Sequence, residues 1–324
     1  MDRRTALKAA LAFGVSATSA PLRAQTQTQA TTRLLVGFQA GAGMDSLARV
    51  LAERLRSALD TVIVENQAGA GGLIAIRAVK AAAADGRTLL LTPSSPLVLS
   101  PHTTNNIGFD PLRDLAPIGR VATFTYALAV AAKTPARTLA EYVALVKREP
   151  AMASFGTAGA RLTTHFLGLI FARGAGINLV HVPYRGAAPA IEDAVSGQIP
   201  AVISTTPSLT ALHERGQLRI LAISDAQRDS ALPDVPTFAE LGFGNLVMEE
   251  WCGIFAPPGL PKSMAETLDT VLRQALADEQ VRQRFAYLGF KATPQPGPAL
   301  AAALKVDYDR WAEIVKTAGF TSND

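Results

Sequence analysis

The segment RLLVGFQAGAGMDSLARVLAERLRSAL, residues 33–59, decides the fold. It starts with a short apolar run at 34–36, continues with a glycine-rich turn, and ends in a segment opened by Asp45 and Ser46. In that last segment apolar residues recur at a spacing of three and four, which places them on one face of a helix. The segment therefore predicts a strand, a loop and a helix, the repeating unit of an α/β domain.

The loop of this unit, residues 37–45, suits a small anion such as a carboxylate or a phosphate. Glycines let backbone N–H groups turn toward a ligand, and the first turn of a helix has unpaired N–H donors and a partial positive charge. Glycine-rich turns also join strands to helices with nothing bound, so the loop alone leaves both interpretations open. It lacks the Gly-Lys-Ser/Thr of a P-loop and the Gly-x-Gly-x-x-Gly of a dinucleotide fold.

The first 24 residues have the pattern of a cleaved export signal. They combine a basic start, an apolar stretch too short to span a membrane, and small residues at their end. Arg3 and Arg4 resemble a twin-arginine signal, although Ala6 stands where that motif prefers Phe. We expect cleavage after Ala24, with Ala20 as the alternative, and a periplasmic location for the mature chain.

Removal of this leader also removes most of the net charge. The full chain carries +4, and the leader holds four basic residues and one acidic residue, so +1 remains. No Lys and Arg stripe with interleaved aromatic residues is left, which argues against nucleic-acid binding. Cys252 is the only cysteine of the sequence, so no internal disulfide forms, and roughly 300 residues bury a sufficient core without one.

The pattern continues and predicts an α/β protein with a mostly parallel sheet. Strands are expected at 61–65 and 88–91, with a helix at 73–84 between them. The loops at 37–45 and 92–96 then lie at the carboxyl ends of parallel strands, where such sheets bind ligands.

A second lobe is expected after an irregular stretch at 101–121. The apolar segment 126–131 predicts a strand that crosses into this lobe, where a strand, a small-residue turn and a helix from Thr163 repeat the first pattern. A later loop carries Arg185, whose guanidinium suits a carboxylate. Loop arginines usually meet only water, so both interpretations of Arg185 stay open.

The expected division of the chain follows from a return crossing at 251–256. Residues 31–125 plus 248–324 form lobe 1, and residues 126–247 form lobe 2. Two lobes suit a mature chain of about 300 residues.

The chemistry-bearing side chains form no catalytic set. The four histidines share no metal-ligand spacing, and neither His-Glu-x-x-His nor Gly-x-Ser-x-Gly occurs. Asp45, at a helix start, fits a cap better than a general base. The sequence therefore predicts a binding protein with no cofactor or metal rather than an enzyme.

Six segments, in family order, resemble the Bug-type receptors, the extracytoplasmic substrate-binding components of tripartite tricarboxylate transporters. They are GFQAGAGMDSLAR (37–49), VENQAGAGGLIAIRAVKAAAADGRTLLL (64–91), FDPLRDLAPIG (109–119), HVPYRGAAPAIEDAVSGQI (181–199), LPDVPTFAELGF (232–243) and WCGIFAPPGLP (251–261). The resemblance covers the mature chain from end to end.

This resemblance implies a two-lobed periplasmic-binding-protein fold of the Venus-flytrap, type II-like class. It implies a monomeric receptor for a small, usually carboxylated ligand, with membrane permease subunits as partners. The ligand-binding residues that it suggests in lobe 1 are Phe38, Ala40, Gly41, Asp45 and Ser94. Those in lobe 2 are Gly159, Thr164, His165, Tyr184, Arg185 and Gly186, and Arg161 is added as a candidate of this chain's own. Two alternatives remain, a receptor that presents its ligand to a sensor and an exported enzyme on the same scaffold.

Three residues depart from the family pattern. Ala42 replaces the second glycine of Pro-Phe-x-x-Gly-Gly, and its methyl group is expected to re-aim the turn. Arg161 and Leu162 replace the later glycine and the serine of the lobe 2 turn. Either Arg161 adds a donor for a dicarboxylate, or Leu162 shrinks the site toward a less polar ligand.

Overall fold

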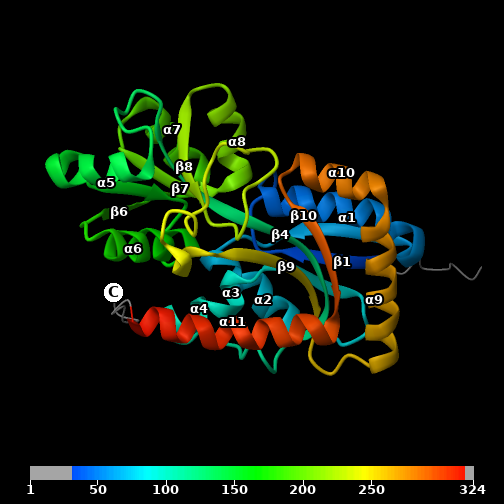
Figure 1. Cartoon of the computed structure of the whole chain (residues 1–324). Helices are drawn as coiled ribbons and strands as arrows, with labels where there is room; N and C mark the ends of the chain where they lie inside the picture. The colour runs from blue at the N-terminus through cyan, green and yellow to red at the C-terminus, as the bar shows by residue number, and fades with distance from the viewer. Residues whose placement is uncertain (1–30, 318–324) are drawn as a thin grey trace, which may run out of the picture.

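The computed structural model describes residues 31–317, so the expected export signal at 1–24 lies outside the described residues. Within them, one ten-stranded sheet carries helices on both faces (Figure 1). A long strand, β4 (Ala116–Ala131), connects the two halves of this sheet. Residues 116–125 of β4 pair with the first half, and residues 126–131 pair with the second half.

The sheet is mixed, which corrects the expectation of a mostly parallel one. The other strands of the first half are β1 (Thr31–Val36), β2 (Thr61–Asn66), β3 (Thr88–Pro93), β9 (Glu249–Ala256) and β10 (Lys291–Pro296). Those of the second half are β5 (Ser154–Thr157), β6 (Val180–Pro183), β7 (Ala201–Thr205) and β8 (Leu218–Ile223). β1 pairs in parallel with β2 and β3, and β5 does so with β6 and β7. Every pair that includes β4 or β9 is antiparallel.

Helices cover both faces of the first half (Figure 1). One face carries α1 (Gly43–Leu59), α9 (Lys262–Ala277) and α10 (Glu279–Tyr287), and the other carries α2 (Leu73–Lys80), α3 (Ser95–Val98), α4 (Ser100–Thr103) and α11 (Gly297–Thr317). The apolar stripe of α1 packs as its spacing predicts, because Leu47, Leu51 and Leu55 are buried in one cluster with Leu272 and Phe285. Each such side chain stabilises the fold by about 1.5–3 kcal/mol.

The second half is covered by α5 (Leu139–Arg148), α6 (Thr163–Ala175), α7 (Ala187–Ser196) and α8 (Thr206–Glu214). Short 3₁₀ turns lie at η1 (Ala70–Gly72), η2 (Pro150–Met152) and η3 (Gly244–Leu246). One buried cluster includes Tyr142 and Phe166 of this half together with Leu300 and Trp311 of α11. The apolar core is therefore continuous from one half to the other.

Two strands differ from the expectation. β4 begins at Ala116, inside the stretch expected to be irregular, because Pro117 and Gly119 are accommodated at irregularities in its pairing with β9. β10 was not expected and contains Pro294 and Pro296, which are typical of loops. It pairs with β4, and Pro296 stands at its end. None of the described helices has the length and apolar character needed to cross a membrane.

Candidate functional site

The glycine-rich loop before α1 is braced by Asp45. Its carboxylate accepts hydrogen bonds from the backbone N–H of Gly41, the guanidinium of Arg49 and the amide of Asn66, each at 2.9 Å. The Asn66 amide also donates to the carbonyl of Phe38 at 3.1 Å. Burial raises the pKa of Asp45, but these hydrogen bonds together hold it below its usual value. Asp45 therefore stays ionised and fixes the loop that carries the exposed Ala40.

Two further loops contact this one. A Cβ atom added at Gly37 would lie 2.5 Å from the Cα of Gly72, so only glycine allows this close approach. A Cβ at Gly72 would lie 3.5 Å from Pro96 and 3.6 Å from the ring of Phe38. The loops at 37–45, 69–72 and 94–96 thus form one surface at the carboxyl ends of β1, β2 and β3, which we call the first rim.

The second rim consists of residues 157–165 and 184–186, which follow β5 and β6. The backbone N–H of Tyr184 donates to the carbonyl of Thr157, and that of Gly186 donates to Ala158, both at 3.0 Å. The hydroxyl of Tyr184 donates to Asp193 on α7 at 2.7 Å. Burial and this carboxylate raise the pKa of Tyr184 to about 12. The predicted residues Gly159, Arg161, Thr164, His165, Tyr184, Arg185 and Gly186 all belong to this rim.

The backbone shows that one departure from the family pattern is strained. Arg161 has φ = 62°, a left-handed conformation that favours glycine, and it stands where the family has glycine. Ala42, by contrast, is extended, with φ = −70° and ψ = 162°. Any residue adopts that conformation, so alanine at position 42 causes no backbone strain.

His165 of the second rim stacks on His181 of β6. The ring centroids of His165 and His181 lie 3.8 Å apart, with the planes inclined by 18°. The hydroxyl of Thr157 donates to the carbonyl of Gly159 at 2.8 Å, so it accepts its 2.7 Å hydrogen bond from Nε2 of His181. Nδ1 of His165 accepts the backbone N–H of Arg161 at 3.3 Å. This hydrogen-bond pattern assigns the proton of each ring to Nε2.

Both rings are neutral at neutral pH. Burial lowers the pKa of His165 to about 4. Burial and the neighbouring His165 lower the pKa of His181 to about 4 as well. His165 is therefore a hydrogen-bond donor through Nε2 and adds no positive charge to the rim.

Two polar groups of the second rim lack partners among residues 31–317. The hydroxyl of Thr164, in the first turn of α6, is buried without a hydrogen bond there. The exposed guanidinium of Arg185 makes no hydrogen bond or ion pair with another described residue. Leaving a buried hydroxyl unsatisfied costs about 1–3 kcal/mol, and a hydrogen bond from a ligand to Thr164 would offset that cost.

A buried carboxylate connects the two rims. Glu250, which is 3% exposed, accepts the backbone N–H of Ser95 at 2.8 Å through one oxygen. Its other oxygen accepts the hydroxyl of Thr163 at 3.2 Å and the hydroxyl of Tyr126. Burial and Glu250 raise the pKa of Tyr126, which keeps this phenol protonated. Ser94, Thr163 and Glu250 also line a cavity of about 20 Å³, enough for one water molecule.

Sequence reasoning did not find Glu250, because its partners lie 155, 124 and 87 residues away. It also missed Asn66 and His181, whose hydrogen bonds reach Asp45 in the first rim and Thr157 in the second. Residue type alone gives no indication of such long-range bonds. The one sign in the sequence was that two acidic residues, Glu249 and Glu250, directly precede the apolar run at 251–256.

The single cysteine of the sequence lies outside both rims. Cys252 is buried, and burial and Glu250 raise the pKa of its thiol. Across residues 31–317 no three His, Cys, Asp or Glu side chains are placed to hold a metal ion. The two rims instead present amides, hydroxyls, an imidazole and a guanidinium, a set suited to holding an anion.

Comparison with known proteins identifies relatives of this architecture. The family model described as tripartite tricarboxylate transporter family receptor matches residues 47–320. The periplasmic binding protein BugD is 32% identical, with a TM-score of 0.81 over 90% of this chain and 98% of that chain. MatC from Rhodopseudomonas palustris with bound malate is 26% identical, with a TM-score of 0.79 over 88% and 98% of the two chains. Rpa4515 from R. palustris with adipate is 26% identical, with a TM-score of 0.83 over 90% and 98%. These structures confirm the expected periplasmic-binding-protein fold.

Proposed function

Because the chain belongs to the family of tripartite tricarboxylate transporter receptors, we propose that it is a periplasmic receptor for a small organic carboxylate. It captures the ligand between its two rims and delivers it to membrane permease subunits as a monomer. MatC and Rpa4515 were solved with malate and adipate, which supports a carboxylate ligand for this chain too. The leader at 1–24 directs export in this proposal.

The proposal includes two lobes that close on the ligand, residues 31–125 plus 248–324 and residues 126–247. The change of partners along β4 supports this division, because residues up to Thr125 pair with β9 and residues from Tyr126 pair with β7 and β8. Glu250 lies beside this boundary, since it binds Tyr126. We expect closure to bring the outer parts of the two rims together, while the bonds of Glu250 to Ser95 and Thr163 hold their shared boundary in place.

The observation that carries the proposal is that each rim ends in the first turn of a long helix. α1 follows β1, and α6 follows β5, so each rim includes a helix start, whose first N–H groups have no acceptor within the preceding turn of the helix. One helix terminus contributes about 0.3–1 kcal/mol, and up to about 2 when partly buried. Micromolar binding needs about 8 kcal/mol. Side-chain hydrogen bonds therefore supply most of the affinity.

We assign the side-chain hydrogen bonds to the ligand mainly to residues of the second rim. Arg185 pairs with a ligand carboxylate, because its guanidinium is otherwise unpartnered among the described residues, and Thr164 satisfies its hydroxyl on the ligand. His165 donates through Nε2, and Arg161 adds a second cation. The remaining predicted residues shape the site: Phe38 gives an apolar wall, Ala40 offers its backbone, and Ser94 offers a hydroxyl. Gly41, Gly159 and Gly186 let a ligand approach loops whose backbone groups already bond within the protein, and Asp45 and Tyr184 hold these loops in place.

Two experiments test this function. Mass spectrometry of small molecules released from the purified protein identifies what co-purifies, and a thermal-shift panel compares carboxylates, amino acids and neutral sugars. A ligand at 100 times its Kd stabilises the protein by about 2.7 kcal/mol. Stabilisation by at least one carboxylate supports the proposal, and stabilisation by neutral or cationic solutes alone contradicts it.

The fate of the ligand separates the receptor from the alternatives. Stoichiometric recovery of unchanged ligand supports a receptor, whereas turnover indicates an exported enzyme. Uptake of the labelled ligand by intact cells tests delivery. Loss of uptake on deletion of this protein supports delivery to a permease, and unchanged uptake with ligand binding intact supports the sensor alternative.

A further inference from the structure

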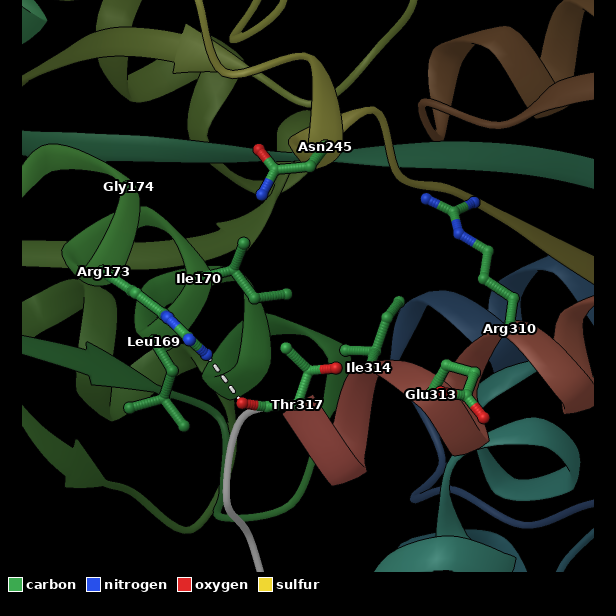
Figure 2. Close-up of a pocket in the computed structure, with 9 residues that line it drawn as sticks. All are labelled: Leu169, Ile170, Arg173, Gly174, Asn245, Arg310, Glu313, Ile314 and Thr317. Atoms are coloured by element: carbon green, nitrogen blue, oxygen red, sulfur yellow. Dashed lines mark hydrogen bonds between the residues drawn. The ribbon is translucent and has the colours of Figure 1, made fainter.

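A cavity of about 660 Å³ lies outside both rims, between α6 and α11 (Figure 2). Residues of α6 form one wall, the C-terminal part of α11 forms the other, and Asn245 of η3 projects from above. Its volume falls within the range of small-molecule sites, about 300–1,000 Å³. None of the twelve residues predicted to bind the carboxylate lines it.

The cavity has an aliphatic centre. Leu169 and Ile170 come from α6, and Ile314 comes from α11. Ile170 and Ile314 lie between the two helices in Figure 2 and pack against the continuous core. All three side chains remain partly exposed. An apolar body that covers them removes this surface from water.

Two arginines flank the aliphatic centre without carboxylate partners among the described residues. Arg310 donates to the carbonyl of Val247 at 3.0 Å, and Arg173 donates to the carbonyl of Thr317 at 2.6 Å. Both acceptors are neutral, so each guanidinium keeps its charge and further N–H donors. Among the described residues that line this cavity, Glu313 is the one carboxylate, so their net charge is +1.

We infer that this cavity is a second ligand site, which takes an amphipathic monoanion such as an aliphatic or aromatic monocarboxylate. The apolar body lies against Ile170 and Ile314, and the carboxylate meets Arg310, whose side chain extends from α11 toward the level of Asn245 in Figure 2. Glu313 disfavours a second negative charge. The site is therefore selective against the dicarboxylates that suit the two rims.

Titration of octanoate into the full protein tests this site by calorimetry. Wild-type protein binds one equivalent with saturation. Ile314→Trp fills the cavity and weakens binding at least about tenfold, and Leu169→Trp does the same from the opposite wall. Val306→Trp is the matched control, because Val306 is 65% exposed on the same helix and does not line the cavity. Thermal unfolding of each variant verifies that it is folded.

Charge is tested separately. Arg310→Gln weakens octanoate about tenfold, as expected for a lost charge-assisted hydrogen bond. Lys316→Gln, on α11 outside the lining, leaves octanoate binding unchanged, and binding of neutral 1-octanol is insensitive to Arg310→Gln. Absence of saturable octanoate binding to wild type, or wild-type affinity in both filled variants, overturns the site.

The two sites are distinguished by Arg185→Ala. This variant retains octanoate affinity if the cavity is the site. If Arg185→Ala abolishes octanoate binding while Ile314→Trp does not, octanoate occupies the rims and the second site is wrong. The outcome at the cavity is thus independent of the carboxylate function proposed for the rims.

Discussion

The hydroxyl of Thr163 donates a 3.2 Å hydrogen bond to the buried carboxylate of Glu250, across 87 residues of chain. The same carboxylate holds the backbone N–H of Ser95 at the start of α3. One buried group therefore fixes the first turn of α6 in the second half against the first half. The orientation of the second rim depends on this contact.

Thr163→Val removes this contact and is expected to lower the free energy of unfolding by about 1.5–3 kcal/mol, because the acceptor is charged. Thr210→Val is the matched control, since its hydroxyl donates to the neutral carbonyl of Thr206 at 3.0 Å. Urea unfolding measures both variants. Equal losses in the two would show that the bond to Glu250 has no special strength.

Arg161 tests the strained turn of the second rim. Both Arg161→Gly and Arg161→Ala remove the guanidinium, but only glycine adopts φ = 62° without strain. We expect the glycine variant to be more stable than the alanine variant by about 1 kcal/mol. Identical denaturation midpoints would indicate that the turn relaxes and that the strain assignment is wrong.

The stacked histidines predict acid sensitivity. Burial holds the pKa of His165 and of His181 at about 4, below the value of about 6.5 in an unfolded chain. The unfolded chain therefore binds more protons, so the stability from this pair is complete above about pH 6.5 and is lost as pH falls toward about 4.

Unfolding free energies measured between about pH 7.5 and 4.5 check this slope. Replacement of both histidines, His165→Gln with His181→Gln, is expected to flatten it. His213→Gln, on α8, controls for loss of a histidine outside the pair. A slope unaffected by the double replacement would contradict the assignment.

The close packing of the loops in the first rim is tested by replacing Gly37 with alanine. Gly37→Ala places a Cβ 2.5 Å from the Cα of Gly72 and is expected to cost about 1–3 kcal/mol of unfolding free energy. It should also weaken ligand binding, because the loops must separate. Gly41→Ala has no atom within 4 Å of its added Cβ, so its only cost is the backbone strain at φ = 83°. Equal effects on affinity in the two variants would argue against a packed rim.

Much of the fold could be predicted from local pattern. Leu47, Leu51 and Leu55 recur every four residues, which places them on one face of α1. That face is buried in a single cluster, so the sequence pattern and the packing agree. β10 escaped prediction because Pro294 and Pro296 favour loops in isolation, and only pairing with β4 makes this segment a strand. Tertiary context overrides local propensity in such a strand.

The parts of the rims formed by glycine-rich loops and helix starts could be predicted from the sequence. The contacts between side chains from distant segments could not. Glycines that follow strands, such as Gly37 and Gly41, indicate the first rim from the amino-acid sequence alone. Nothing local connects Glu250 with Thr163, or His165 with His181, because these contacts form only when the sheet assembles. The roles of Arg185 and Thr164 in binding remain predictions that binding measurements must test.

Calorimetric titration of the carboxylate identified by co-purification or thermal shift, into wild type and Arg185→Ala, tests the central claim most directly. We expect Arg185→Ala to raise the Kd by about tenfold or more, since a charge-assisted hydrogen bond is lost. Its melting temperature should be unchanged, because the guanidinium has no partner among the described residues. Arg137→Ala, an exposed arginine outside both rims, is the control and should retain the wild-type Kd. An unchanged Kd in Arg185→Ala would contradict the claim that the rims hold the carboxylate.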